Sequence, residues 1–161
     1  MLPWLVVALP IAFVITWYPA WHVTLWIDNG THDRVTVRGN DHELASVAAG
    51  SHVETSIPRG AIHITTSAGD NVDIDSRVTT GSWVLNVGRA HCYEWQTFGY
   101  AKNENALYFG REAKRYDERL FNVTASWFFR PPPATIAVRK ERAIAALPEE
   151  RAALQIVGCE R

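Results

Sequence analysis

The sequence predicts a mainly β protein: an antiparallel, immunoglobulin-like β-sandwich with one N-terminal transmembrane helix and a short C-terminal helix. Three observations predict this fold. A charge-free apolar run opens the chain, short alternating apolar and polar runs follow at intervals of roughly ten residues, and a segment rich in Ala, Glu and Arg closes it. We therefore divide the chain into an anchor (1–26), a β-sandwich domain (27–130) and a Pro-rich exit with an extended and helical tail (131–161).

The first 27 residues contain no Lys, Arg, Asp or Glu, and a helix of this length spans a bilayer core of about 30 Å. Aromatic residues mark both edges of the run, Trp4 at one and Trp17, Tyr18 and Trp21 at the other. Such side chains favour the membrane–water interface. Pro10 lies in the middle, where we expect it to kink the helix. The sequence thus predicts an uncleaved, single-pass anchor in the lipid bilayer.

Two alternatives stay open for this segment, a secretory signal peptide and a buried core segment. A signal peptide has a basic residue before its apolar run, and here there is none. Cleavage after Ala20 would also place bulky Tyr18 where a small residue is required. A central proline and the long charge-free run argue against a core segment. Charges after the run are mixed, and we place the soluble domain on the periplasmic, extracytoplasmic side.

Residues 22–27 and 34–38 alternate apolar and polar side chains, which indicates half-buried strands. Asn29-Gly30 between them predicts a hairpin turn, because both residue types accept positive φ. Residues 103–119 mix basic and acidic side chains and predict a solvated loop, with a partner or headgroup contact as the alternative. The other expected strands cover 52–57, 61–67, 71–78, 82–87 and 92–100, which makes about seven in all, and 120–129 is strand-like in composition.

An aromatic cluster precedes a stiff proline segment near residue 130. Exposed aromatic side chains mark interfaces, and consecutive prolines force an extended path. The candidate partner contacts are therefore Trp127, Phe128, Phe129, Arg130, Pro131, Pro132 and Pro133. The alternative for Trp127 is burial in the core of its own domain.

The tail carries the start signals of a helix. Pro148 tolerates the first helical position, and Glu149 and Glu150 suit a helix N-terminus. Ala153, Leu154 and Val157 would then form one apolar stripe before Gly158. This pattern predicts the short C-terminal helix.

The two cysteines, Cys92 and Cys159, permit one disulfide in an oxidising compartment, and two buried thiols are the alternative.

A net charge of -1 gives no basic patch for nucleic acid. The regularly spaced histidines match the strand repeat better than a converging metal site, and the run from Asp70 to Asp75 lacks the glycine and glutamate of a calcium loop. We expect no metal, no cofactor and no catalytic residues, with no small-molecule substrate evident.

One segment resembles a known family. Ser56-Ile57-Pro58-Arg59-Gly60-Ala61-Ile62-His63-Ile64, with Gly69 beyond it, is similar to the strand-turn-strand centre of small bacterial surface modules of the PEGA type. The resemblance covers some thirty residues, and the Pro-Glu-Gly-Ala signature itself is absent. It implies a β-sandwich near a bacterial envelope with a binding or structural role, and it assigns no catalytic residue.

These features together predict a non-catalytic accessory or structural subunit of a larger membrane protein complex. The helix would pack among integral membrane subunits, and the β domain and tail would contact partner proteins. A free-standing, membrane-anchored binding module of the bacterial envelope is the alternative. An enzyme whose catalytic residues are distant in sequence is the third hypothesis.

Overall fold

The computed structural model describes residues 21–77, 79–100, 107–134, 136 and 149–159. The predicted anchor positions Trp4, Pro10, Trp17 and Tyr18 lie outside these ranges. Within the ranges, no helix has the length and apolar character needed to cross a membrane. Trp21 is described, and its side chain is exposed.

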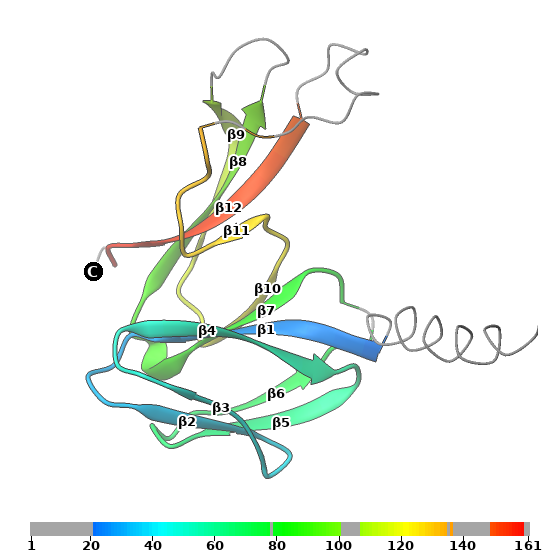
Figure 1. The fold of residues 1–161 in the computed structure, drawn as a ribbon, viewed down its shortest axis with the longest axis vertical. Helices are drawn as coiled ribbons and strands as arrows, with labels where there is room; N and C mark the ends of the chain where they lie inside the picture. Colours follow the sequence, from blue (N-terminus) through cyan, green and yellow to red (C-terminus); the bar gives the residue numbers. More distant parts are fainter. Residues whose placement is uncertain (1–20, 78, 101–106, 135, 137–148, 160–161) are drawn as a thin grey trace, which may run out of the picture.

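The described part of the chain is built from strands, with one short 3₁₀ turn (Figure 1). The strands are β1 (His22–Asn29), β2 (Val35–Gly39), β3 (His42–Val47), β4 (Ser51–Pro58), β5 (Ala61–Thr66), β6 (Asn71–Asp75), β7 (Ser82–Asn86), β8 (Cys92–Tyr100), β9 (Leu107–Tyr116), β10 (Leu120–Val123), β11 (Trp127–Phe128) and β12 (Glu149–Val157), and the 3₁₀ turn is η1 (Val87–Arg89). The prediction of a mainly β protein is confirmed.

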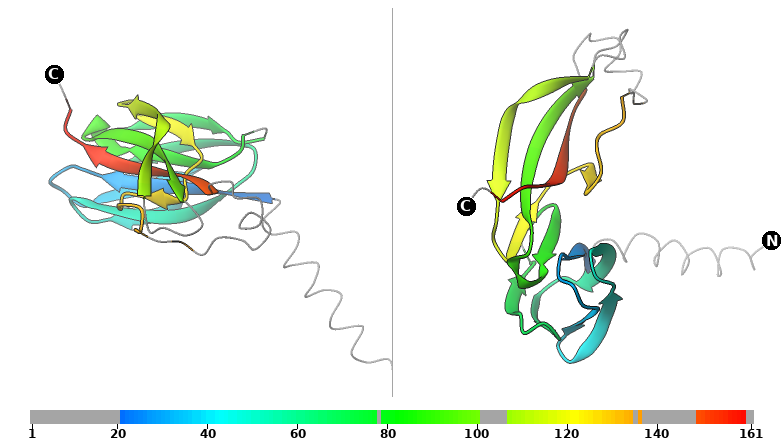
Figure 2. Two further views of the ribbon diagram at one scale, coloured as in Figure 1. Left: turned by 90° about the horizontal axis from the view of Figure 1, so that it is seen from above. Right: turned by 90° about the vertical axis from the view of Figure 1, so that its left-hand side faces the viewer.

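The strands form three four-stranded sheets. Sheet A has the order β10-β7-β1-β4, sheet B the order β3-β2-β5-β6, and sheet C the order β11-β12-β8-β9. Sheets A and B lie face to face as a β-sandwich, and sheet C extends away from it, as Figures 1 and 2 show. Two strand pairs are parallel, β1 with β7 and β11 with β12, so the predicted antiparallel arrangement does not hold throughout.

Sheet A is the middle layer, because it packs on both faces. Val23, Leu25 and Ile27 of β1 point into the apolar core shared with sheet B. Trp26, the next residue on the opposite face, packs toward a second cluster that holds Tyr93 of sheet C. This alternation follows from the two-residue period of a strand. A third cluster lies within sheet C and includes residues of β8, β11 and β12.

The predicted Asn29-Gly30 hairpin is wrong. Strand β1 pairs with β4 and β7, and β2 pairs with β3 and β5 in the other sheet. Neither Asn29 nor Gly30 has positive φ. The buried Asn29 side chain instead donates to the backbone oxygens of Asp33, Val47 and Ala48, which fixes the crossing between the sheets.

A two-residue hairpin does occur slightly later, at Asn40 and Asp41. Their φ values are 46° and 69°, which suits the tight turns that match the twist of a hairpin. These residues connect β2 to β3, a strand that the sequence pattern did not predict.

The predicted C-terminal helix is wrong, because its residues form strand β12. Over its whole length β12 pairs with β8, from Glu149 opposite Tyr100 to Val157 opposite Cys92. The loop expected over residues 103–119 is likewise wrong over Leu107–Tyr116, which forms β9 on the other side of β8. The tail therefore belongs to sheet C, and strand β1 begins at His22, inside the range assigned to the anchor.

Candidate functional site

The outer face of sheet A, away from sheet B, is only partly covered by sheet C. Val84 of β7 and Phe121 and Val123 of β10 are buried in the cluster shared with sheet C. At the other side of the same face, His52 and Glu54 of β4 are exposed. The open half of this face forms the floor of a groove.

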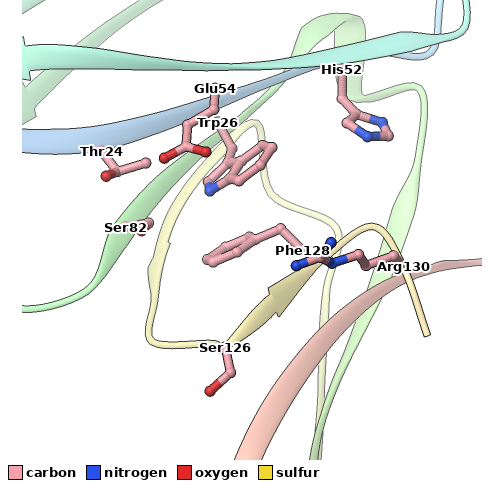
Figure 3. Close-up of a pocket in the computed structure, with 8 residues that line it drawn as sticks. All are labelled: Thr24, Trp26, His52, Glu54, Ser82, Ser126, Phe128 and Arg130. Atoms are coloured by element: carbon pink, nitrogen blue, oxygen red, sulfur yellow. The ribbon is translucent and has the colours of Figure 1, made fainter. Parts of the chain in front are cut away.

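The β11 segment provides the opposite wall. Thr24 and Trp26 of β1, His52 and Glu54 of β4, Ser82 of β7, and Ser126, Phe128 and Arg130 of the β11 segment line a groove of about 480 Å³ (Figure 3). Segments about a hundred residues apart in the sequence thus meet here. We call this site the aromatic groove.

An aromatic stack holds the two walls together. The rings of Trp26 and Phe128 are parallel to within 16°, with centroids 5.0 Å apart. Phe129 meets Trp26 edge-on at 5.6 Å and contacts the His52 ring at 4.7 Å. Aromatic pairs in these geometries add about 1 kcal/mol each beyond burial. The aromatic contacts therefore link the two walls of the groove.

The groove contains one acidic and one basic side chain. Glu54 and Arg130 are exposed and come from opposite walls, and Figure 3 shows the aromatic stack between the two segments. Thr24, Ser82 and Ser126 line the remainder. A surface with aromatic walls, an arginine and hydrogen-bonding side chains has the composition of a protein interface.

The predicted partner contacts divide into three groups. Phe128 and Arg130 line the groove. Trp127 is buried in the cluster within sheet C, beside Tyr100, so the core alternative holds for this residue. Phe129 does not line the groove but contacts the rings of Trp26 and His52, and its φ is positive, 57°.

The proline segment runs on from the groove along sheet C. Pro131 and Pro133 are exposed and Pro132 is half-buried. The Tyr100 hydroxyl donates a hydrogen bond of 2.6 Å to the Pro133 carbonyl oxygen. The start of the predicted exit is thus held against the fold and exposes its prolines next to Arg130.

A second polar cluster lies where sheet A meets the start of sheet C. Oδ2 of Asp28, a residue that is 1% exposed, accepts hydrogen bonds from Nδ1 of His91 and from the Tyr93 hydroxyl, both at 2.7 Å. Burial and then the Asp28 carboxylate raise the pKa of Tyr93 well above its usual range. The ring of His91 lies over Gly30, where a Cβ would approach Nε2 to 2.7 Å. This cluster fixes the two sheets to each other.

Cys92, between His91 and Tyr93, forms a disulfide with Cys159. Of the two states that the sequence allows, the structure therefore has the bridge. It joins the first residue of β8 to the chain just after β12, with a Cα–Cα distance of 5.3 Å. The antiparallel pairing of Cys92 with Val157 places the two cysteines close enough for it.

The described residues contain no group of three or more His, Cys, Asp or Glu side chains that could hold a metal ion. Sequence reasoning singled out Phe128 and Arg130 but missed Thr24, Trp26, His52 and Glu54. The available signal was Trp26, a large aromatic residue at the outward position of a strand whose Val23, Leu25 and Ile27 already face a core. No family model, curated protein or solved structure matches the chain.

Proposed function

We propose that the protein is a non-catalytic accessory subunit of a larger membrane complex, and that it binds a partner protein at the aromatic groove. The observation that carries this proposal is the groove itself. It combines a fixed Trp26–Phe128 stack with exposed Glu54 and Arg130, a combination that suits protein recognition. Integral membrane subunits and the lipid bilayer are the expected surroundings of the N-terminal run.

The location we propose is the periplasmic, extracytoplasmic side of the membrane, with a single N-terminal span. The Cys92–Cys159 disulfide supports this location, because such bonds persist in oxidising compartments and are rare in the cytosol. The charge-free run over the first 27 residues supports the span. The immunoglobulin-like interpretation and the PEGA-type resemblance belong to the same proposal, supported by the two facing sheets A and B.

Solubilisation of the native membrane in a mild detergent, followed by size separation, tests the proposal. We expect the chain to migrate with a complex much larger than its own 18.1 kDa. Glu54→Arg and Arg130→Glu should release it, because each reverses a charge in the groove. Migration of the unaltered chain as a monomer would contradict the proposal and favour a free-standing binding module.

Two matched variants control for the change of charge itself. Arg34→Glu reverses an exposed arginine in the connection between β1 and β2, and Glu43→Arg reverses an exposed glutamate on β3 of sheet B. Neither residue lines the aromatic groove. Both variants should remain in the complex. If they dissociate as readily as Arg130→Glu, the groove is not the contact.

A further inference from the structure

Strand β4 is an edge of sheet A. Among the described strands it pairs with β1 alone, and its eight residues keep one continuous register from Ser51 opposite Asn29 to Pro58 opposite His22. The other edge of β4 therefore presents backbone N–H and C=O groups that no described strand uses. Such an edge is a template on which another strand can pair.

The other edge strands of the described sheets carry features that discourage pairing. Strand β10 has four residues and β11 has two. The β2–β3 and β8–β9 pairings both contain register shifts, and exposed charges lie along β6 and β9, namely Asp73, Asp75, Lys114 and Arg115. Short strands, irregularities and charges are the usual protections of a sheet edge.

Strand β4 lacks these protections over most of its length. It is regular, and residues 52–57 include Val53, Thr55 and Ile57, residue types that favour strands. Its proline, Pro58, is at the very end, and Glu54 is its one acidic residue. An unprotected edge of this length in a folded domain points to pairing with another chain.

The edge also borders the aromatic groove. His52 and Glu54 of β4 line the groove, so a strand added to β4 would place alternate side chains on the same face. The side chain directly opposite Glu54 would have its Cβ about 5 Å from that of Glu54. A lysine or arginine there is favoured, and an acidic residue is repelled.

We propose that the partner protein docks as an extended strand on the free edge of β4, with a basic residue beside Glu54. This inference rests on the proposed function and specifies the mode of binding. Backbone hydrogen bonds along β4 supply the pairing, and the groove accepts the side chains on one face of the added strand. The Glu54 carboxylate sets the register.

Two blocked eight-residue peptides test this docking on the full-length protein. Both alternate threonine and valine, and one carries a central lysine where the other carries a central glutamate. We expect the lysine peptide to slow hydrogen exchange of amides in residues 51–58 and to bind about fivefold or more tightly than the glutamate peptide. Glu54→Lys should reverse the preference.

The lysine peptide with N-methylated backbone amides is the matched control, because it keeps the side chains and loses the backbone N–H donors. It should give no protection of β4. The inference is overturned if the lysine peptide at millimolar concentration leaves residues 51–58 unprotected, or protects β9 equally. It is also overturned if Glu54→Lys leaves the preference between the peptides unchanged.

Proline variants separate the mode of binding from the proposed function. Successive residues of an edge strand direct their N–H groups to opposite sides, so one of Thr55→Pro and Ser56→Pro removes a bond to β1 and the other removes only an outward donor. The variant that retains the melting temperature should leave the membrane complex. If it stays while Arg130→Glu dissociates, docking along β4 is wrong and the groove proposal stands.

Discussion

Asp28 joins two sheets through a single carboxylate oxygen. It lies on β1, and its two hydrogen-bond donors are Tyr93 of β8 and His91, which directly precedes β8. A buried carboxylate costs free energy unless its hydrogen bonds are made, so these donors are required by the position of Asp28. Asn86, which is also buried, positions His91 through its backbone: the Asn86 amide donates to the His91 carbonyl oxygen at 2.7 Å.

Asp28→Ala should lower the free energy of unfolding by about 3 kcal/mol, because it leaves the buried Tyr93 hydroxyl and His91 Nδ1 without their acceptor. Asp73→Ala is the matched control. Asp73 accepts from His63 Nδ1 at the same 2.7 Å but is exposed, so its loss should cost no more than about 0.5 kcal/mol. Urea unfolding measures both, and equal losses would contradict a special role for Asp28.

The raised pKa of Tyr93 predicts that the free energy of unfolding falls in alkali. Its pKa is raised in the folded protein by burial and by Asp28, whereas in the unfolded chain it titrates near 10. The contribution of Tyr93 to the free energy of unfolding is therefore complete below about pH 10. It is lost as the pH rises above that value, because Tyr93 in the unfolded chain releases its proton before Tyr93 in the folded protein does. Tyr93→Phe should flatten the fall in unfolding free energy between about pH 9 and 11.

Some slope should remain in the Tyr93→Phe variant, because burial also raises the pKa of Tyr100. The unfolding free energy is measured by denaturant titration at each pH. A slope identical to that of the unaltered protein would show that Tyr93 ionises as easily in the fold as in the unfolded chain.

At the scale of the element, the alternating pattern predicted the strands that have one apolar and one polar face. Residues 22–27 and 61–67 are examples, and both are strands at close to the expected limits, β1 and β5. Their apolar positions face the core shared by sheets A and B. A local pattern is sufficient in such strands, because one buried face imposes the two-residue period directly on the sequence.

Strand β12 shows where local signals fail. Glu149, Glu150 and Ala153 favour a helix start by their intrinsic preferences, and those preferences are worth a few tenths of a kcal/mol each. Pairing with β8 over nine residues, and burial of Leu154 against sheet A, outweigh them. The paired residues are 49 positions apart at one end of the strand (Tyr100 and Glu149) and 65 at the other (Cys92 and Val157), so no window around residue 150 contains this information.

Strand β9 was missed for a different reason. It is the outer strand of sheet C, and exposed edges carry charged side chains, which resemble a solvated loop in the sequence. The groove was missed for the same kind of reason as β12: Trp26 and Glu54 are neighbours only because β1 pairs with β4, and Phe128 joins them only through β11. Composition near residue 130 indicated one wall and gave no sign of the other.

The disulfide should stabilise sheet C in particular. It closes a loop with a sequence separation of 67, and the entropy that such a link removes from the unfolded chain corresponds to about 4 kcal/mol. The variant Cys92→Ser with Cys159→Ser should unfold at a correspondingly lower denaturant concentration. Reductant should shift the unaltered protein to the same value and leave the variant unchanged. A reductant effect on the variant would show that another process is being measured.

At the scale of the whole molecule, sheet A packs against sheet B on one face and against sheet C on the other, and the two contacts differ in size. Among the described residues, twelve buried side chains form the core between sheets A and B, and five form the cluster that joins sheet A to sheet C. Apolar burial contributes about 25 cal/mol per Å², so the larger core has the greater stability. The Asp28 cluster and the disulfide add polar and covalent links at the smaller contact.

This inequality predicts two levels of opening in the native protein. Amides of β8 and β12 should exchange with solvent through a partial opening of lower free energy than the opening that exposes β1, β2 and β5, because fewer buried side chains hold sheet C to the rest. Hydrogen exchange under native conditions, read strand by strand, measures both free energies. Reduction of the Cys92–Cys159 bond should speed exchange in β8 and β12, and the free energy of opening of these strands should stay below that of β1, β2 and β5. Equal free energies in all three sheets would instead mean that the molecule opens as one unit, with sheet C as strongly coupled to sheet A as sheet B is.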